Sequence, residues 1–249
     1  MRYLYVFINL VLPFIGCTQI VNIESLRKTE VDTIPLHYRI EASTALSKNT
    51  RSIFWINLGS DIQFHRGQHT WLSVTDLNFN RSGGETLLNE GFQHLRYNRD
   101  LSEAVGLEAF VQGQYNEAIK LRMRGLLGMG IRIDLVEDEK LQIKYGISYM
   151  YEYDEESEAG FIHRDHRMNN YLSMGLNLSN QATLSSTTYF QPVAFRFNDF
   201  RLSSQTALTL KISDRLRFQA AFALQYDSRN PSGVPPSIYR LTSGLVWAR

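Results

Sequence analysis

From residue 36 onward, the apolar residues of this chain recur at every second position. In residues 141–154, for example, leucine, isoleucine and tyrosine alternate with glutamine, lysine, glycine and acidic residues. Successive side chains of a β-strand point to opposite faces, so each such stretch has one apolar face and one polar or small face. The pattern predicts an all-β chain.

Twelve stretches carry this alternation. They cover residues 35–46, 52–65, 69–80, 90–99, 104–116, 120–136, 140–154, 165–179, 181–193, 200–212, 215–227 and 238–248. Most exceed the ~5–6 residues of an ordinary strand, and they fit the ~9–11 residues with which a tilted strand crosses a bilayer. The strand lengths therefore favour a protein that crosses a membrane with strands.

The number of strands indicates which face meets lipid. A closed sheet of about eight strands can fill its interior with side chains, whereas a larger one encloses a lumen. With about twelve strands the polar face would line a wet interior and the apolar face would meet lipid. We therefore expect a single antiparallel up-and-down transmembrane β-barrel of about 12 strands, the alternative being a soluble two-sheet sandwich.

The N-terminus resembles an export signal. Arg2 precedes an apolar run that ends near Ile15, and small residues follow it. This pattern is typical of a signal peptide, and the run is too short to span a bilayer as a helix. We expect cleavage after Thr18, giving a signal peptide over 1–18, a periplasmic lead-in over 19–34 and a barrel over 35–249. The alternative is a lipoprotein signal with lipid on Cys17.

The links between stretches differ in length. Those after even-numbered stretches are short, whereas several after odd-numbered ones are long, at residues 81–89, 155–164 and 228–237. Outer-membrane barrels have short periplasmic turns and longer outer loops. The links therefore favour an outer-membrane barrel with a periplasmic N-terminus, although two odd-numbered links are also short.

Charge and cysteine content exclude two classes of protein. The net charge is +1, whereas a nucleic-acid-binding protein would carry a basic excess on one face. The single cysteine, Cys17, cannot form an internal disulfide, so the chain is no disulfide scaffold. The partners we expect are outer-membrane lipid and, during biogenesis, the barrel-assembly machinery. We expect a monomer with no cofactor.

Residues 84–98, GETLLNEGFQHLRYN, resemble the DUF481 family of uncharacterised bacterial outer-membrane proteins, some of them described as salt-induced. Further matches follow in the family's order at residues 107–110, 114–116, 150–153, 184–192 and 226–229. The resemblance covers about residues 36–248. It implies an outer-membrane barrel and brings no agreed activity, substrate or catalytic residue.

Seven side chains are candidates for the lumen face. They are His94, Arg96, Glu108, Arg122, Arg124, Arg132 and Lys144. A tight turn near residue 100 would bring His94 across from Glu108, either as an acid/base pair or as a structural contact within a polar network. We favour the structural contact and expect His94→Ala to leave the barrel folded.

The basic residues of the lumen face allow two interpretations. A turn near residue 138 would put Lys144 opposite Arg132, and rings of Arg and Lys can favour anions in a pore. Acidic residues share the same wall, so a mixed network that holds the barrel together is the favoured interpretation. His163, Asp165 and His166 could hold a divalent metal ion, but we favour a solvated outer loop there.

Three function classes remain open. A small pore or a structural, stress-related envelope protein comes first. A loop-mediated binding or adhesion protein is the second, and a membrane-embedded enzyme acting on lipid is the third. The last has least support because no serine has a histidine and a carboxylate at supporting positions, so we expect no catalytic residue.

Overall fold

The computed structural model describes residues 35–158 and 160–247. They form twelve strands and one short 3-10 helix: β1 (Leu36–Lys48), β2 (Ser52–Arg66), β3 (His69–Ser82), β4 (Glu85–Asp100), β5 (Val105–Asn116), η1 (Glu117–Ile119), β6 (Leu121–Glu137), β7 (Leu141–Glu156), β8 (Ile162–Ser179), β9 (Ala182–Val193), β10 (Arg196–Lys211), β11 (Leu216–Asp227) and β12 (Ser237–Trp247). The twelve predicted stretches are thereby confirmed as strands. The predicted signal peptide and lead-in lie outside the described residues.

The strands form one antiparallel up-and-down sheet in chain order, from β1 to β12. The β3–β4 link differs from the expectation of a long loop over residues 81–89. Gly83 and Gly84 take φ values of +61° and +93° and close a two-residue turn, so both strands extend further than predicted. Positive φ at both central residues suits the right-handed twist of a hairpin, and glycine adopts it without steric cost. The link over residues 228–236 is long, as expected.

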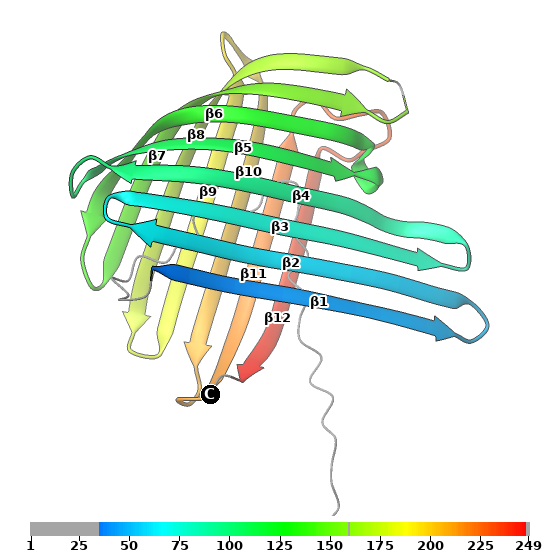
Figure 1. The fold of residues 1–249 in the computed structure, drawn as a ribbon, viewed down its shortest axis with the longest axis horizontal. Helices are drawn as coiled ribbons and strands as arrows, with labels where there is room; N and C mark the ends of the chain where they lie inside the picture. Colours follow the sequence, from blue (N-terminus) through cyan, green and yellow to red (C-terminus); the bar gives the residue numbers. More distant parts are fainter. Residues whose placement is uncertain (1–34, 159, 248–249) are drawn as a thin grey trace, which may run out of the picture.

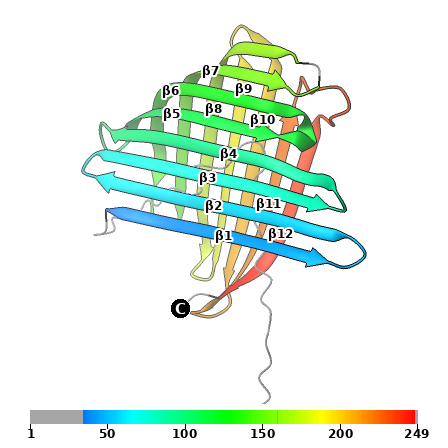
Figure 2. The ribbon, with the colours of Figure 1, turned by 45° about the vertical axis from the view of Figure 1, so that its right-hand side comes forward.

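The sheet curls so that its two halves face each other (Figures 1 and 2). In Figure 1 the strands β1 to β6 run across the strands β8 to β12 behind them. Strands of a barrel tilt by ~35–45° from its axis, so opposite walls cross at about twice that angle. The curl of this sheet is therefore that of a barrel wall.

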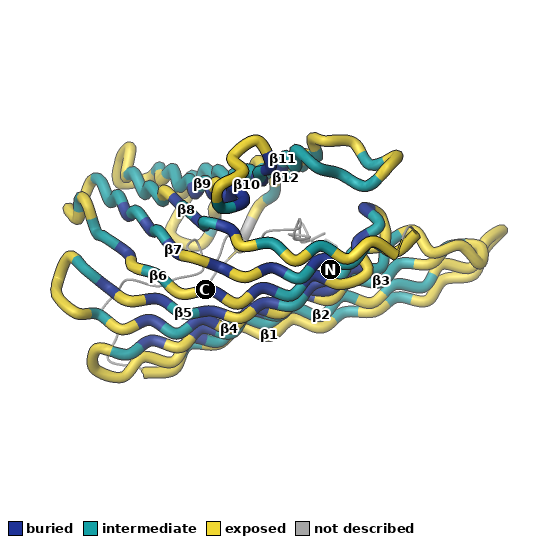
Figure 3. The backbone as a smooth tube through the Cα atoms, turned by 90° about the horizontal axis from the view of Figure 1, so that it is seen from above, coloured by how far each residue is buried: buried dark blue, intermediate teal, exposed yellow. Residues whose placement is uncertain are grey.

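Burial follows the alternation (Figure 3). The convex face carries the large exposed apolar side chains, for example Leu95, Leu127 and Met129. The concave face carries buried polar and charged side chains together with a small apolar cluster of Phe110, Leu126 and Met150. This arrangement is the reverse of a soluble sandwich, in which an apolar core lies inside.

Strands β1 and β12 are the two edges of the sheet, and no pairing between them occurs among the described residues. Within residues 35–158 and 160–247, no helix has the length and apolar character needed to cross a membrane.

Candidate functional site on the concave face

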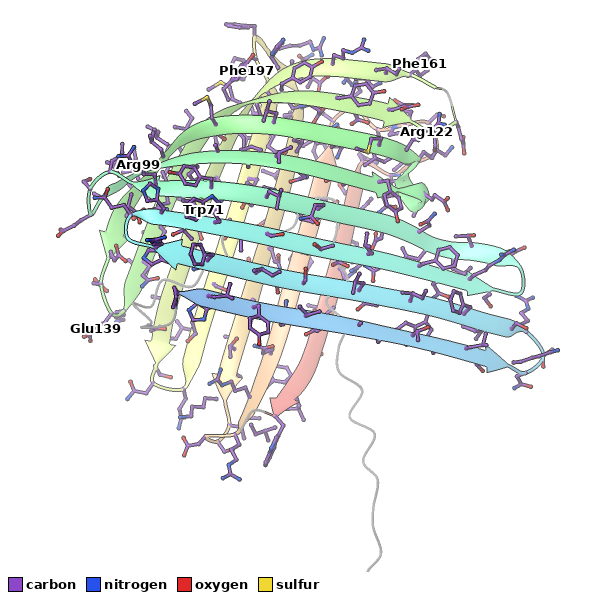
Figure 4. All side chains as sticks on the ribbon, viewed as in Figure 1. Trp71, Arg99, Arg122, Glu139, Phe161 and Phe197 are labelled. Atoms are coloured by element: carbon purple, nitrogen blue, oxygen red, sulfur yellow. The ribbon has the colours of Figure 1, made fainter. Side chains whose placement is uncertain are left out.

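Six of the seven candidate side chains are buried on the concave face: His94, Arg96, Glu108, Arg124, Arg132 and Lys144. Arg122 differs, because the pairing of β6 with β7 shifts register between Leu121 and Met123. Arg122 falls in this bulge, and its side chain is 66% exposed where it pairs with Glu155 at the sheet end. Figure 4 labels Arg122 at that end.

His94 lies across from Gln112 rather than from Glu108, because the β4–β5 link spans residues 101–104 and is longer than a tight turn. Its Nδ1 is 3.0 Å from Gln112 Oε1. Its ring lies between those of Phe92 and Phe110, at centroid distances of 6.1 Å and 5.6 Å. The surroundings of His94 are therefore those of a packed side chain, and no carboxylate contacts it to form an acid/base pair within the described residues.

Glu108 joins strands that are not neighbours. The Tyr171 hydroxyl of β8 donates to both Glu108 carboxylate oxygens, at 3.1 Å and 3.0 Å. Arg96 and Arg132 approach the same carboxylate at 3.9 Å and 3.8 Å. The cluster thus extends from β4 to β8 across the curl of the sheet, and the Arg96 guanidinium also lies over the rings of Phe110 and Tyr171.

Lys144 lies opposite Asp134 rather than opposite Arg132. The second register shift of β6 and β7, between Asp134 and Val136, sets this pairing. Asp134 Oδ1 is 3.5 Å from Lys144 Nζ and 3.2 Å from Arg132 Nε, while Arg132 Nη2 donates to Asp100 at 2.8 Å. The two basic residues share carboxylates, so they form no ring of positive charge.

A second network, which we call the arginine lattice, fills the concave face between β6 and β11. Its members are Arg124, Glu152, Asp154, Asp165, Arg167, Arg196, Asp199, Arg201, Asp227 and Arg229. Arg201 pairs with Glu152, with Asp154 at 2.8 Å and with Asp227 at 2.6 Å. The lattice contains five arginines and five carboxylates, so its formal charges cancel.

Alternation in the sequence placed Arg124 and the acidic residues that share its wall, Glu152 and Asp154, on the lumen face, but the lattice members beyond β7 were not foreseen. The signal was present, because strand alternation places Glu152, Arg167 and Arg201 on the polar face of their strands. What the sequence lacks is the distance between non-adjacent strands. Arg201 of β10 meets β7, three strands away along the sheet, only because the sheet curls.

The two histidines considered as metal ligands, His163 and His166, do not come together in the structure. His163 lies in β8, rather than in a loop, and its Nε2 contacts Glu156 Oε1 at 3.1 Å. His166 of the same strand stacks on Tyr149 and lies at a tilt beside Tyr151. Positions three apart on a strand point to opposite faces, so the two histidines cannot share an ion. No cluster of at least three histidine, cysteine or acidic residues suited to a metal occurs in the described part of the chain.

Comparison with solved structures finds matches at low identity. A structure titled NanC porin matches with 10% identity and a TM-score of 0.48, over 84% of this chain and 98% of that one. OccK11 (OpdR) of Pseudomonas aeruginosa matches with 7% identity and a TM-score of 0.36, over 84% and 78%. No curated protein matches the chain.

The family comparison covers far more of the sequence. The family described as "Protein of unknown function, DUF481" matches residues 40–248. That range includes nearly all of the twelve strands and every member of the two concave clusters. The chain therefore belongs to the DUF481 family.

Proposed function

We propose that this protein is exported to the bacterial outer membrane, closes there as a twelve-strand barrel, and forms a small pore. Support comes from its two faces. The convex face presents apolar side chains that suit lipid, and the concave face is polar. In a membrane every backbone group needs an internal partner, so the edge strands β1 and β12 would pair.

The main support for the pore is that large side chains crowd only one part of the concave face. Strands near the two edges place several small or short polar side chains there, namely Ser43, Ala45, Asn57, Gly59, Ala221, Ala223, Thr242 and Gly244, beside longer ones such as Arg39, Trp55 and Arg240. Strands β4 to β8 place large, mutually paired side chains on the same face. The small side chains leave room for water beside the packed part of the wall.

The packed part gives the proposed pore a rigid, charge-balanced side. Arg167 is 0% exposed and bonds to the Gln191 carbonyl at 3.0 Å as well as to two carboxylates. Every guanidinium so held is fixed in place and electrically compensated. A pore of this kind discriminates mainly by size, because the described residues of the concave face form no uncompensated ring of one charge.

Planar-bilayer recording of the refolded full-length chain tests the proposal. We expect discrete conductance steps with weak selectivity between small cations and anions. Absence of any conductance from a protein that shows heat-modifiable migration would overturn the pore and leave the structural envelope role. Fractionation of cells that express the chain tests its location. We expect to recover the protein in the outer-membrane fraction.

A further inference from the structure

A small cavity lies at the end of the concave face, beneath the link over residues 228–236. Its volume is about 30 Å³. The lining residues that the argument uses are Arg124, Asp154, Arg201, Gln225, Asp227 and Asn230. The cavity lies between the arginine lattice and the link, apart from the small-residue wall of the proposed pore.

Two amide groups of the lining lack partners. Gln225 Nε2 and Asn230 Nδ2 are buried and make no hydrogen bond. The Gln225 side chain belongs to a residue that is 7% exposed, on the concave face of β11. A buried donor without an acceptor loses its hydration and gains nothing in return. Two such donors lining one cavity indicate a ligand that accepts hydrogen bonds.

The lining holds three carboxylates, those of Asp154, Glu156 and Asp227, and all have partners; Glu156 Oε1 is 3.1 Å from His163 Nε2. Asp154 Oδ2 accepts from Arg124 at 2.7 Å and from Arg201 at 2.8 Å, and Asp227 Oδ2 accepts from Arg201 at 2.6 Å. The unpartnered side-chain atoms of the lining are N–H donors. These features disfavour a cation, which would need free oxygen ligands.

We propose that this cavity is a binding site for a small monovalent anion of the size of chloride. Its ligands would be Gln225 Nε2 and Asn230 Nδ2, and the side chains of Lys120, Arg124 and Arg201 also line the cavity. A cavity must offer ~10–15 Å³ on this measure to hold one water molecule, so this one has room for a monatomic anion, whereas sugars and nucleotides are far larger. The proposal is independent of whether the barrel conducts.

Lys120 connects segments of the chain that lie near the cavity. Lys120, in the left-handed conformation with φ 58°, donates from Nζ to Glu158 at 2.6 Å and to the Ser232 carbonyl at 2.9 Å. It therefore connects the end of η1 with Glu158 and with the 228–236 link. Lys120 also lines the cavity, so these contacts hold one part of the cavity wall in place.

The test uses bromide as a probe, because its anomalous scattering identifies it in crystals of the full-length chain. The thermal midpoint of the refolded protein is measured in parallel, in sodium chloride and in sodium gluconate at equal ionic strength, since gluconate is too large to enter. We expect a bromide peak beside Gln225 and Asn230. We also expect a higher midpoint in chloride, because a ligand that binds the folded state stabilises it.

Two variants reverse the chemistry of the site without changing its shape. Gln225→Glu and Asn230→Asp replace a donor with a carboxylate, and we expect each to weaken bromide binding at least about tenfold. Asn230 lies in a link outside the strands, so Asn230→Asp keeps the test valid should Gln225→Glu fail to fold. Gln219→Glu is the control, because Gln219 lies on the same strand and face but outside the lining.

A bromide peak together with loss of the chloride effect in both variants supports the site. Ordered water alone in the cavity, in crystals grown at high bromide, overturns it. An equal chloride effect in native protein, Asn230→Asp and Gln219→Glu also overturns it, because the stabilisation would then come from general salt screening.

Discussion

Arg167 of β8 and Glu152 of β7 form an ion pair of 3.1 Å between Nε and Oε1, with side chains that are 0% and 1% exposed. Two charges taken out of water to this extent pay a large desolvation cost, which their attraction and added hydrogen bonds must offset. Arg167 makes such bonds to Asp199 and to the Gln191 carbonyl, and Glu152 also pairs with Arg201. The pair is therefore one junction of a lattice that joins β7, β8 and β10.

Arg167→Met should destabilise the protein strongly, because it leaves Glu152 and Asp199 with too few cations in a buried place. We expect a loss of about 3–5 kcal/mol in the free energy of unfolding. Urea unfolding in detergent, followed by tryptophan fluorescence, measures it. Arg122→Met is the matched control, since Arg122 pairs with Glu155 in solvent, where such pairs contribute about 0–1 kcal/mol. Equal losses in the two variants would contradict the importance of burial.

Gly130→Ala should destabilise the sheet, because a Cβ there would lie 2.2 Å from the Ile147 carbonyl oxygen and 2.4 Å from Ser148 Cα. Backbone atoms cannot move aside as a flexible side chain can, so the strands must shift. Overpacking of this kind costs about 1–3 kcal/mol. Gly125→Ala on the same strand has nothing within 4 Å of the added atom and should be neutral. Thermal midpoints of the two variants compare them directly.

Much of the fold could be predicted from the sequence, because strand alternation is a local property. Period two assigns the strands and divides each into an apolar and a polar face, and the β1–β12 order follows from short links. Details that depend on the turns could not be predicted. Gly83 and Gly84 make the β3–β4 link shorter than expected. The β4–β5 link over residues 101–104 is longer than expected and changes the pairing of these two strands, so His94 faces Gln112.

The clusters themselves could be predicted less well. Sequence reasoning placed Glu108 on the polar face but could not supply its partner Tyr171, which lies 63 positions along the chain. Such contacts depend on how tightly the sheet curls, which follows from twist and packing across the whole barrel rather than from any segment. Bulges act in the same way, since one extra residue turned Arg122 to the outside.

His94→Ala should leave the protein folded but less stable. The change removes a ring packed between Phe92 and Phe110 and leaves the buried Gln112 amide oxygen without its partner. Together these effects should lower the free energy of unfolding by about 2–4 kcal/mol. His65→Ala, at an exposed position of β2 where the ring nitrogen meets Thr70 Oγ1 at 2.9 Å, should cost less, about 1 kcal/mol. Denaturant unfolding at neutral pH distinguishes the two, and an unchanged His94→Ala midpoint would contradict the packed role.

Asp138 in the β6–β7 link should make the stability depend on pH. Its carboxylate accepts hydrogen bonds from the backbone N–H groups of Leu141 and Lys140, both at 2.7 Å, and these bonds lower its pKa. Its contribution is therefore complete above the unfolded pKa of about 3.9 and is lost as pH falls through the lower folded pKa. Asp138→Asn removes this titration, so the stability difference between native and variant should shrink between pH 7 and pH 3. A difference independent of pH would contradict the assignment.

The proposed pore makes a prediction that separates the two faces of a single strand. Ala221 of β11 lies on the concave face opposite Thr242, whereas the preceding Ala220 lies on the convex face opposite Ser243. Ala221→Phe should lower single-channel conductance, because the ring fills part of the small-residue wall, and Ala220→Phe should leave conductance unchanged because its ring meets lipid. Both variants add the same apolar volume to the same strand, so differences in folding are matched. Equal conductance in the two variants, measured in planar bilayers, would place the conducting path elsewhere than along β11.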